Sequence, residues 1–289
     1  MGREAPTFSS DSAKPSSWVV PICLAGSLAL AALQPAEAQM LDPEPRSFTP
    51  VSQEWGPQVL WSNPAALGVG DEGTFLGLLS FVPNPGRTDA EFGQAVLGTR
   101  MGPFGLGVRR ERLRPGVDEE TIMGTGVTIG VGFGGESFAV GALNDQYRRG
   151  ITSSRWELGV LWKPLESLTL GGVWRDIGSP VIIAREREQS FTAGATVQGL
   201  DGRVEGSLEV THQNGGIESY RSIVVGRFDA LDVLAGLDVD SGGSVRGLRV
   251  GLGYSMGGHR GFGVVDRKME RVGGDASGFT LGGIREMEP

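Results

Sequence analysis

The sequence from residue 156 to residue 162 is Trp-Glu-Leu-Gly-Val-Leu-Trp, in which Trp156, Leu158, Val160 and Trp162 alternate with other residues. Successive side chains of a β-strand point to opposite faces, so this alternation predicts a strand with one continuous apolar face. About fourteen segments of about ten residues repeat the pattern between Gly73 and Arg285. A tilted strand of this length is long enough to cross a bilayer.

The repeated alternation predicts the fold class. In lipid every backbone N–H and C=O group must be bonded within the protein, and a closed barrel achieves this because it has no free edge. We therefore predict an all-β fold, a transmembrane antiparallel β-barrel of about 14 strands preceded by a short N-terminal segment. A soluble sandwich or propeller is the alternative, and aromatic residues at the ends of the apolar stripes favour the barrel.

The links between the predicted strands alternate between two classes. The short links lie at 102–103, 134–135, 164–166, 199–202, 229–230 and 257–258. The long links lie at 83–90, 114–120, 144–154, 176–188, 213–218, 240–245 and 268–276. Short turns of bacterial outer-membrane barrels face the periplasm, so this alternation predicts a chain in the outer membrane with both ends periplasmic.

The chain divides into four predicted segments. The first carries Arg3 and Lys14, then an apolar run over 18–33, then the small residues Ala36 and Ala38, as in a secretory signal peptide. A membrane anchor is the weaker interpretation, because the run is shorter than about twenty residues. The predicted segments are a signal peptide (1–38), an N-terminal hatch or plug segment (39–72), an outer-membrane β-barrel (73–285) and a C-terminal tail (286–289).

Composition and motifs exclude several classes of function. The net charge of −8 argues against nucleic acid as a partner, because nucleic-acid binding calls for a basic surface. The single cysteine, Cys23, lies in the predicted signal peptide, and the two histidines, His212 and His259, lie on different predicted strands. The chain also has no Gly-x-Ser-x-Gly stretch. We expect no catalytic site, no metal site and no cofactor, and a protein that is not an enzyme.

Charged residues of both signs fall on the predicted inward face of the strands. Acids and bases that alternate there are expected to pair across a water-filled or plugged interior, whereas an ion-selective ring needs one dominant sign. The candidate lumen residues are Arg109, Glu111, Glu157, Lys163, Arg175, Glu205, Glu209, Arg221, Arg227, Asp232, Asp238 and Arg249.

A compact motif precedes the first predicted strand. Residues 61–68 read Trp-Ser-Asn-Pro-Ala-Ala-Leu-Gly, an apolar turn that continues through an Asn-Pro turn signal. This stretch resembles the Asn-Pro-Ala-Gly-Leu hatch motif of the FadL long-chain fatty acid transporters, with Ala66 in place of the glycine. It is equally similar to the PorV-like barrels associated with protein secretion. The resemblance implies a fourteen-stranded barrel closed by a hatch, with the hatch residues Trp61, Asn63, Pro64, Ala65, Ala66 and Leu67.

Two functions are compatible with this sequence. The first is a FadL-like barrel that passes a hydrophobic or amphipathic small molecule across the outer membrane, and it is favoured because Leu76 and Leu78 are apolar on the predicted inward face. The second is a PorV-like barrel that transports nothing and docks a secretion-system or periplasmic partner. A third hypothesis is an enzyme that the barrel anchors in the membrane, and only the lack of a terminal aromatic residue in the last strand suggests it.

One long link contains a run of apolar residues, Val181, Ile182 and Ile183. This run is a candidate outer-loop contact.

Overall fold

The computed structural model describes the chain from Phe48 onward, with short gaps. The described residues are 48–54, 58–70, 73–83, 90–113, 122–149, 151–182, 185–186, 188–270 and 274–287. The predicted signal peptide, and the part of the predicted plug segment before residue 48, lie outside these residues. No helix among the described residues is long and apolar enough to span a membrane.

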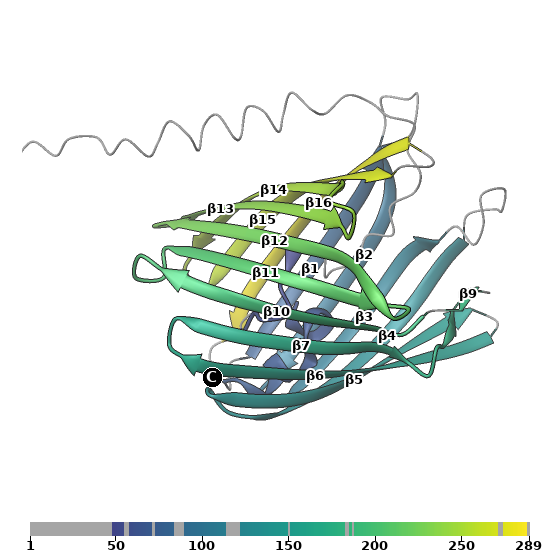
Figure 1. The fold of residues 1–289 in the computed structure, drawn as a ribbon, viewed down its shortest axis with the longest axis horizontal. Helices are drawn as coiled ribbons and strands as arrows, with labels where there is room; N and C mark the ends of the chain where they lie inside the picture. The colour runs from purple at the N-terminus through teal and green to yellow at the C-terminus, as the bar shows by residue number, and fades with distance from the viewer. Residues whose placement is uncertain are drawn as a thin grey trace, which may run out of the picture. The chain divides into compact units, whose positions relative to one another are not determined.

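Fourteen of the described strands form one closed antiparallel barrel, which confirms the predicted fold class (Figure 1). Neighbours in sequence are neighbours in the wall, and β1 pairs with β16 to close it. The barrel strands are β1 (Gly73–Pro83), β2 (Ala90–Met101), β3 (Phe104–Leu113), β4 (Ile122–Gly134), β5 (Phe138–Arg149), β6 (Ile151–Leu165), β7 (Leu168–Ile177), β10 (Ser190–Gly199), β11 (Val204–Gln213), β12 (Gly216–Phe228), β13 (Leu231–Asp240), β14 (Val245–Met256), β15 (His259–Glu270) and β16 (Gly274–Met287).

Strand alternation separates an apolar outer face from a mixed inner face. Trp156 on β6 is 53% exposed and faces outward, whereas Glu157 beside it is fully buried inside. Leu76 and Leu78 of β1 are buried on the inner face, in a cluster with Phe48, Val264 and Ile284. The inward leucines therefore contact other apolar side chains.

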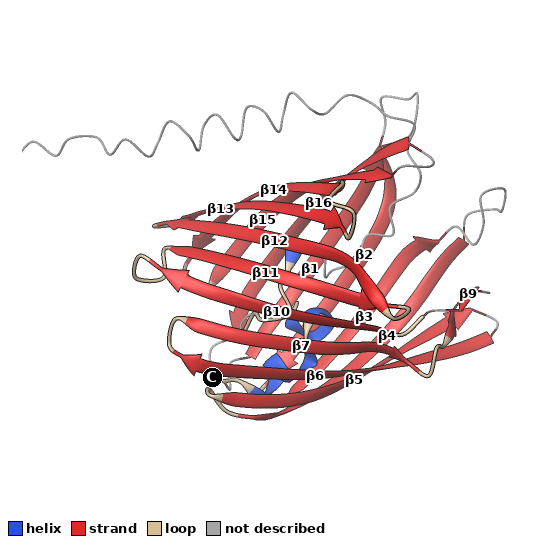
Figure 2. Ribbon diagram, in the orientation of Figure 1, coloured by secondary structure: helices blue, strands red, loops and turns tan. Residues whose placement is uncertain are grey.

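The N-terminal elements lie inside the ring of strands (Figure 2). They are a short α-helix, α2 (Val59–Ser62), and a 3₁₀-helix, η2 (Pro64–Gly68), and Val59–Leu67 are all buried. The η2 helix contacts β4, β5 and β6. A second, two-stranded sheet pairs β8 (Val181–Ile182) with β9 (Arg185–Glu186) in the link between β7 and β10.

Several links that the sequence predicts to be long are much shorter. Between β5 and β6 the strands run to Arg149 and resume at Ile151, so most of the predicted 144–154 link is strand. The polar residues there suggest a loop, but they belong to β5 and β6. Between β11 and β12 the link is the two-residue turn Asn214-Gly215, with positive φ at both residues. An Asn-Gly pair favours this hairpin turn because both residues tolerate the left-handed region.

Candidate functional site

The N-terminal segment is fixed around Asn63. Its side chain accepts a hydrogen bond from the Ala65 N–H (3.0 Å), which caps the 3₁₀-helix, and Pro64 occupies the first turn. The same amide donates to the carbonyls of Val51 (2.6 Å) and Val160 (3.0 Å). One side chain thus ties together two parts of the segment and the inner face of β6.

Glycines on the barrel wall allow this segment to approach the strands closely. A Cβ atom at Gly141 would overlap the carbonyl of Pro64, and one at Gly159 would overlap the Asn63 side chain. Trp61 occupies the space over Gly107 in the same way. We name this set the glycine wall: Gly98, Gly105, Gly107, Gly130, Gly132, Gly141, Gly159, Gly171 and Gly194.

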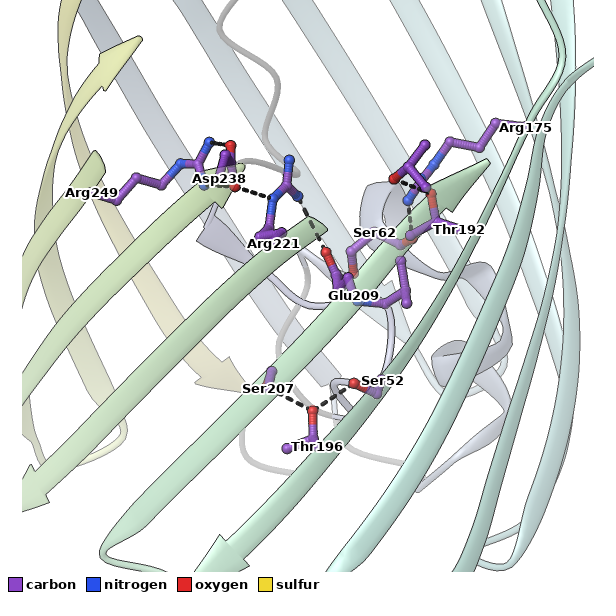
Figure 3. Close-up of polar contacts among 12 residues, drawn as sticks. Ser52, Ser62, Arg175, Thr192, Thr196, Ser207, Glu209, Arg221, Asp238 and Arg249 are labelled. Carbon is purple, nitrogen blue, oxygen red and sulfur yellow. Dashed lines mark hydrogen bonds and ion pairs between the residues drawn. The ribbon is translucent and has the colours of Figure 1, made fainter. Parts of the chain in front are cut away.

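Polar side chains of the wall hold the segment at further points (Figure 3). Arg175 donates to the carbonyl of Ser62 (2.9 Å), and the hydroxyls of Ser52 and Thr196 are 2.5 Å apart. The indole N–H of Trp61 donates to Thr128 (3.0 Å). Glu54 pairs with Lys163 (2.9 Å). The segment therefore combines apolar packing with specific hydrogen bonds, as a rigid plug would require.

Charged residues on β3–β7 form a cluster shielded from water. Asp145 accepts from both Arg109 (2.9 Å) and Arg155 (2.8 Å), and the guanidinium groups of these arginines lie against the Tyr147 ring. Each arginine also lies near a second acid: Arg109 is 3.4 Å from Glu111, and Arg155 is 3.6 Å from Glu157. Arg175 approaches Glu157 from the other side (3.7 Å). This buried ion cluster lies beside the N-terminal segment, which it contacts where Arg175 donates to the carbonyl of Ser62.

Charged residues on β11–β15 differ in accessibility, and Glu205, Glu209 and Arg249 are buried. The Arg221 side chain is 30% exposed, whereas that of Arg109 is 2% exposed. Asp238 pairs with Arg221 (3.1 Å) and Arg249 (2.5 Å), as Figure 3 shows. Nearer the short turns, Arg227 pairs with Glu205 (2.6 Å) and Arg260 pairs with Asp232. Part of the interior along β11–β15 is therefore accessible to solvent at Arg221 and Arg227.

A cavity of about 70 Å³ lies between the N-terminal segment and β12–β16. Much of its lining is apolar, with Phe48, Val225, Leu234, Phe262 and Val264. It shares Arg260 and Ile284 with a larger cavity of about 460 Å³. The larger cavity includes the β14–β15 turn, Gly257-Gly258, so it lies at the short-turn mouth of the barrel. The small cavity therefore lies next to the cavity at that mouth, with Arg260 and Ile284 lining both.

Two polar atoms at the small cavity lack a hydrogen-bond partner among the described residues. They are Oε1 of Gln58 and Oγ1 of Thr49, both on buried side chains. Gln58 is the N-cap residue of α2, but its side chain makes no capping bond. A buried carbonyl oxygen without a donor is unfavourable, so this cavity offers a bond to a ligand that carries an N–H or O–H group.

The structure brings together most of the predicted site residues. Every candidate lumen residue faces the interior, and the candidate hatch residues pack against β3–β6. Of the outer-loop residues, Ile183 lies outside the described residues, and Val181 and Ile182 are described only at the backbone. Sequence reasoning missed Asp145, because it placed this residue in the 144–154 loop, and it missed Arg155, which directly follows that predicted loop. It also missed Phe48 and Gln58, which precede the strands and carry no periodic signal.

No described group of three or more His, Cys, Asp and Glu side chains could hold a metal ion. The expected absence of a metal site stays a prediction.

Comparison with known proteins identifies the fold. No protein-family model matches the chain, and no curated protein is similar to it in sequence. The solved structures give a different result. The Ralstonia pickettii toluene transporter TbuX superposes with a TM-score of 0.60 at 12% identity, covering 84% of this chain and 98% of TbuX. The Pseudomonas putida toluene transporter TodX gives 0.56 at 12% identity, with 86% and 99% covered. A Pseudomonas aeruginosa FadL homologue gives 0.51 at 12% identity, with 83% and 95% covered. The chain shares its barrel fold with these proteins.

Proposed function

We propose that the chain is an outer-membrane barrel through which a neutral, mainly apolar small molecule passes. Its short turns face the periplasm, and residues 51–68 form a hatch that keeps the barrel closed to ions. The observation that carries the proposal is the apolar cavity beside this segment, which lies next to the cavity at the short-turn mouth. The shared fold supports the proposal, because two of the proteins compared are described as toluene transporters.

The cavity also favours a class of ligand. Its acids Glu205 and Asp232 are paired with arginines, so a charged ligand would have to break an ion pair to gain a partner. An apolar body would pack against Phe48, Phe262 and Leu234. One donor group would bond to the unpaired oxygen of Gln58. A phenol or an aromatic amine combines these properties.

The test is a binding measurement with two probes on the purified barrel in nanodiscs. Para-cresol carries a hydroxyl donor, and its methyl ether has nearly the same apolar body without the donor. Gln58→Leu should weaken para-cresol binding about tenfold, since a hydrogen bond in such a site is worth about 1–3 kcal/mol, and should leave ether binding unchanged. Gln198→Leu, at the mouth cavity, is the matched control and should change neither affinity. If neither probe binds the unmodified protein, the proposed ligand class is wrong.

A docking scaffold for a secretion or periplasmic partner is the second candidate function. The buried ion cluster on β3–β7 favours it, because a salt-bridged interior stiffens a wall without opening a path. The candidate outer-loop contact, Val181 to Ile183, would then be part of the docking surface.

A further inference from the structure

Arg260 of β15 lies at the boundary between the small apolar cavity and the larger mouth cavity. It lines both cavities, and so does Ile284 of β16. The two residues are opposite each other in the strand register, so their side chains project inward side by side with Cβ atoms about 5 Å apart. The Arg260 side chain is 22% exposed, whereas Ile284 is buried. One charged and one apolar side chain therefore share this boundary.

Asp232 of β13 holds Arg260 on the side of the small cavity. The guanidinium donates to this carboxylate across β14, which lies between the two strands. Gly253 of β14 leaves room for the contact, because a Cβ atom there would lie 3.3 Å from Cβ and 3.4 Å from Oδ2 of Asp232. Asp232 lines the small cavity and is not among the described residues that line the mouth cavity. The ion pair therefore lies across the inner surface of β14.

A second acid, Glu286 of β16, lies on the mouth side of Arg260. It lines the mouth cavity and is two residues beyond Ile284 on the same face of the strand. Cβ atoms in this diagonal relation are about 7–8 Å apart, which is within reach of an arginine side chain. Glu286 forms no ion pair with any described residue, and its Oε2 would be 3.9 Å from a Cβ atom at Gly258. Arg260 therefore has one acid on each side.

The neighbouring ion pair lowers the cost of moving Arg260. Glu205 pairs with Arg227 (2.6 Å), and Arg227 is also opposite Asp232 in the strand register. Asp232 therefore stays beside a cation when Arg260 leaves it. The ion pair of Arg260 with Asp232 is also partly exposed, with side chains 22% and 13% exposed. Ion pairs in contact with water contribute little free energy, so the two positions of Arg260 differ little in free energy.

We propose that Arg260 is a gate between the two cavities, paired with Asp232 when the passage is closed and with Glu286 when it is open. Moving the guanidinium toward Glu286 clears the inner surface of β14 and leaves Ile284 as an apolar side of the passage. Such a passage suits a neutral ligand, because both acids at the gate compete for one arginine. This inference rests on the proposed function and names the residue that controls movement between the small cavity and the short-turn mouth.

The test measures how fast a neutral thiol reagent reaches the small cavity, so it requires no bound ligand. Val225 lines this cavity, and Val225→Cys in the full chain with Cys23→Ser provides a single thiol. In nanodiscs, Glu286→Gln should slow modification of this thiol by methyl methanethiosulfonate about threefold, and Asp232→Asn should speed it about threefold. Loss of either acid shifts Arg260 toward the other, and partly exposed ion pairs support changes of this size.

The matched control is Asp229→Asn. Asp229 is an exposed acid in the β12–β13 turn, and it is not among the described residues that line either cavity. Its loss should leave the modification rate unchanged. Arg260→Gln should raise the rate, and adding Glu286→Gln to that variant should have no further effect, since Glu286 acts through Arg260. Heat-modifiable migration of each variant should show that the barrels are folded.

Three outcomes would overturn this inference: a rate that neither acid substitution changes, a change in the same direction in both, and no modification even in the Arg260→Gln variant. Failure of the proposed function would give a different result. If the rates change as expected but para-cresol does not bind, the gate is supported and the proposed ligand class is wrong. If para-cresol binds and the rates do not change, the ligand class is supported and Arg260 is not the gate.

Discussion

We expect that replacing both Gly141 and Gly159 with leucine displaces the N-terminal segment and leaves the wall of fourteen strands folded. Both residues lie on the inner face of adjacent strands, and at both a side chain would overlap the plug: the backbone of Pro64 at Gly141 and the amide of Asn63 at Gly159. Inserting bulk into such a packed contact costs about 1–3 kcal/mol per site, and displacement of the segment relieves it. Single-channel conductance in planar bilayers should rise several-fold.

The control for this experiment is Gly206→Leu on β11, where an added Cβ would meet no atom within 4 Å. Its conductance should equal that of the unmodified chain. Deleting residues 51–68 should reproduce the conductance of the double leucine variant, because both changes remove the same obstruction. If neither the double variant nor the deletion has a higher conductance than the unmodified chain, the N-terminal segment does not close the lumen.

Removing Asp145 should destabilise the barrel more than loss of any exposed ion pair. Its carboxylate bonds to Arg109 and Arg155 and also accepts from Thr128, and its side chain has no exposed surface. Asp145→Ala leaves two buried guanidinium groups short of an acceptor, which costs about 3–5 kcal/mol. The free energy of unfolding, measured by urea titration in lipid vesicles, should fall by that amount.

Glu218→Ala provides the comparison for this measurement. Glu218 pairs with Arg246 at an exposed site, so its loss should cost less than about 1 kcal/mol. Equal destabilisation by the two substitutions would mean that the buried ion cluster contributes no more than a surface pair.

The fold was predictable because its signal is repeated and local. Alternation such as that from Trp156 to Trp162 fixes which side chains face out, and pairing of successive strands then follows from short connections. The prediction that these charged side chains face inward rests on the same alternation along each strand. Link lengths were less predictable, because polar residues such as Asn144 and Gln146 look like loop while lying on the outer face of a strand.

The candidate site was only partly predictable. The Asn-Pro turn at Asn63 is a local signal, so its role in capping the 3₁₀-helix could be anticipated in outline. The hydrogen-bond partners of Asn63, Val51 and Val160, could not be predicted, because they depend on how the N-terminal segment packs inside the barrel. The glycine wall could not be predicted for the same reason. A glycine that admits Trp61 and one that merely fits a curved strand look identical in sequence.

The cavity beside Gln58 has no sequence signal at all. It lies between the N-terminal segment, which packs closely against glycines of β2–β7 and β10, and strands β12–β16, and its apolar lining comes from strands far apart in the chain. The proposed ligand class rests on the buried oxygen of Gln58, which has no hydrogen-bond partner among the described residues.

The most direct test of the central claim is the initial rate at which radiolabelled para-cresol enters Gram-negative cells that produce the chain. Val225 lines the cavity, whereas its neighbour Val224 is 50% exposed on the outer face. With equal amounts of folded barrel in the outer membrane, Val225→Trp should fill the cavity and reduce entry to the rate of cells without the chain, and Val224→Trp should leave it unchanged. Entry that is the same with and without the unmodified chain, or that is unaffected by Val225→Trp, would contradict transport through this cavity.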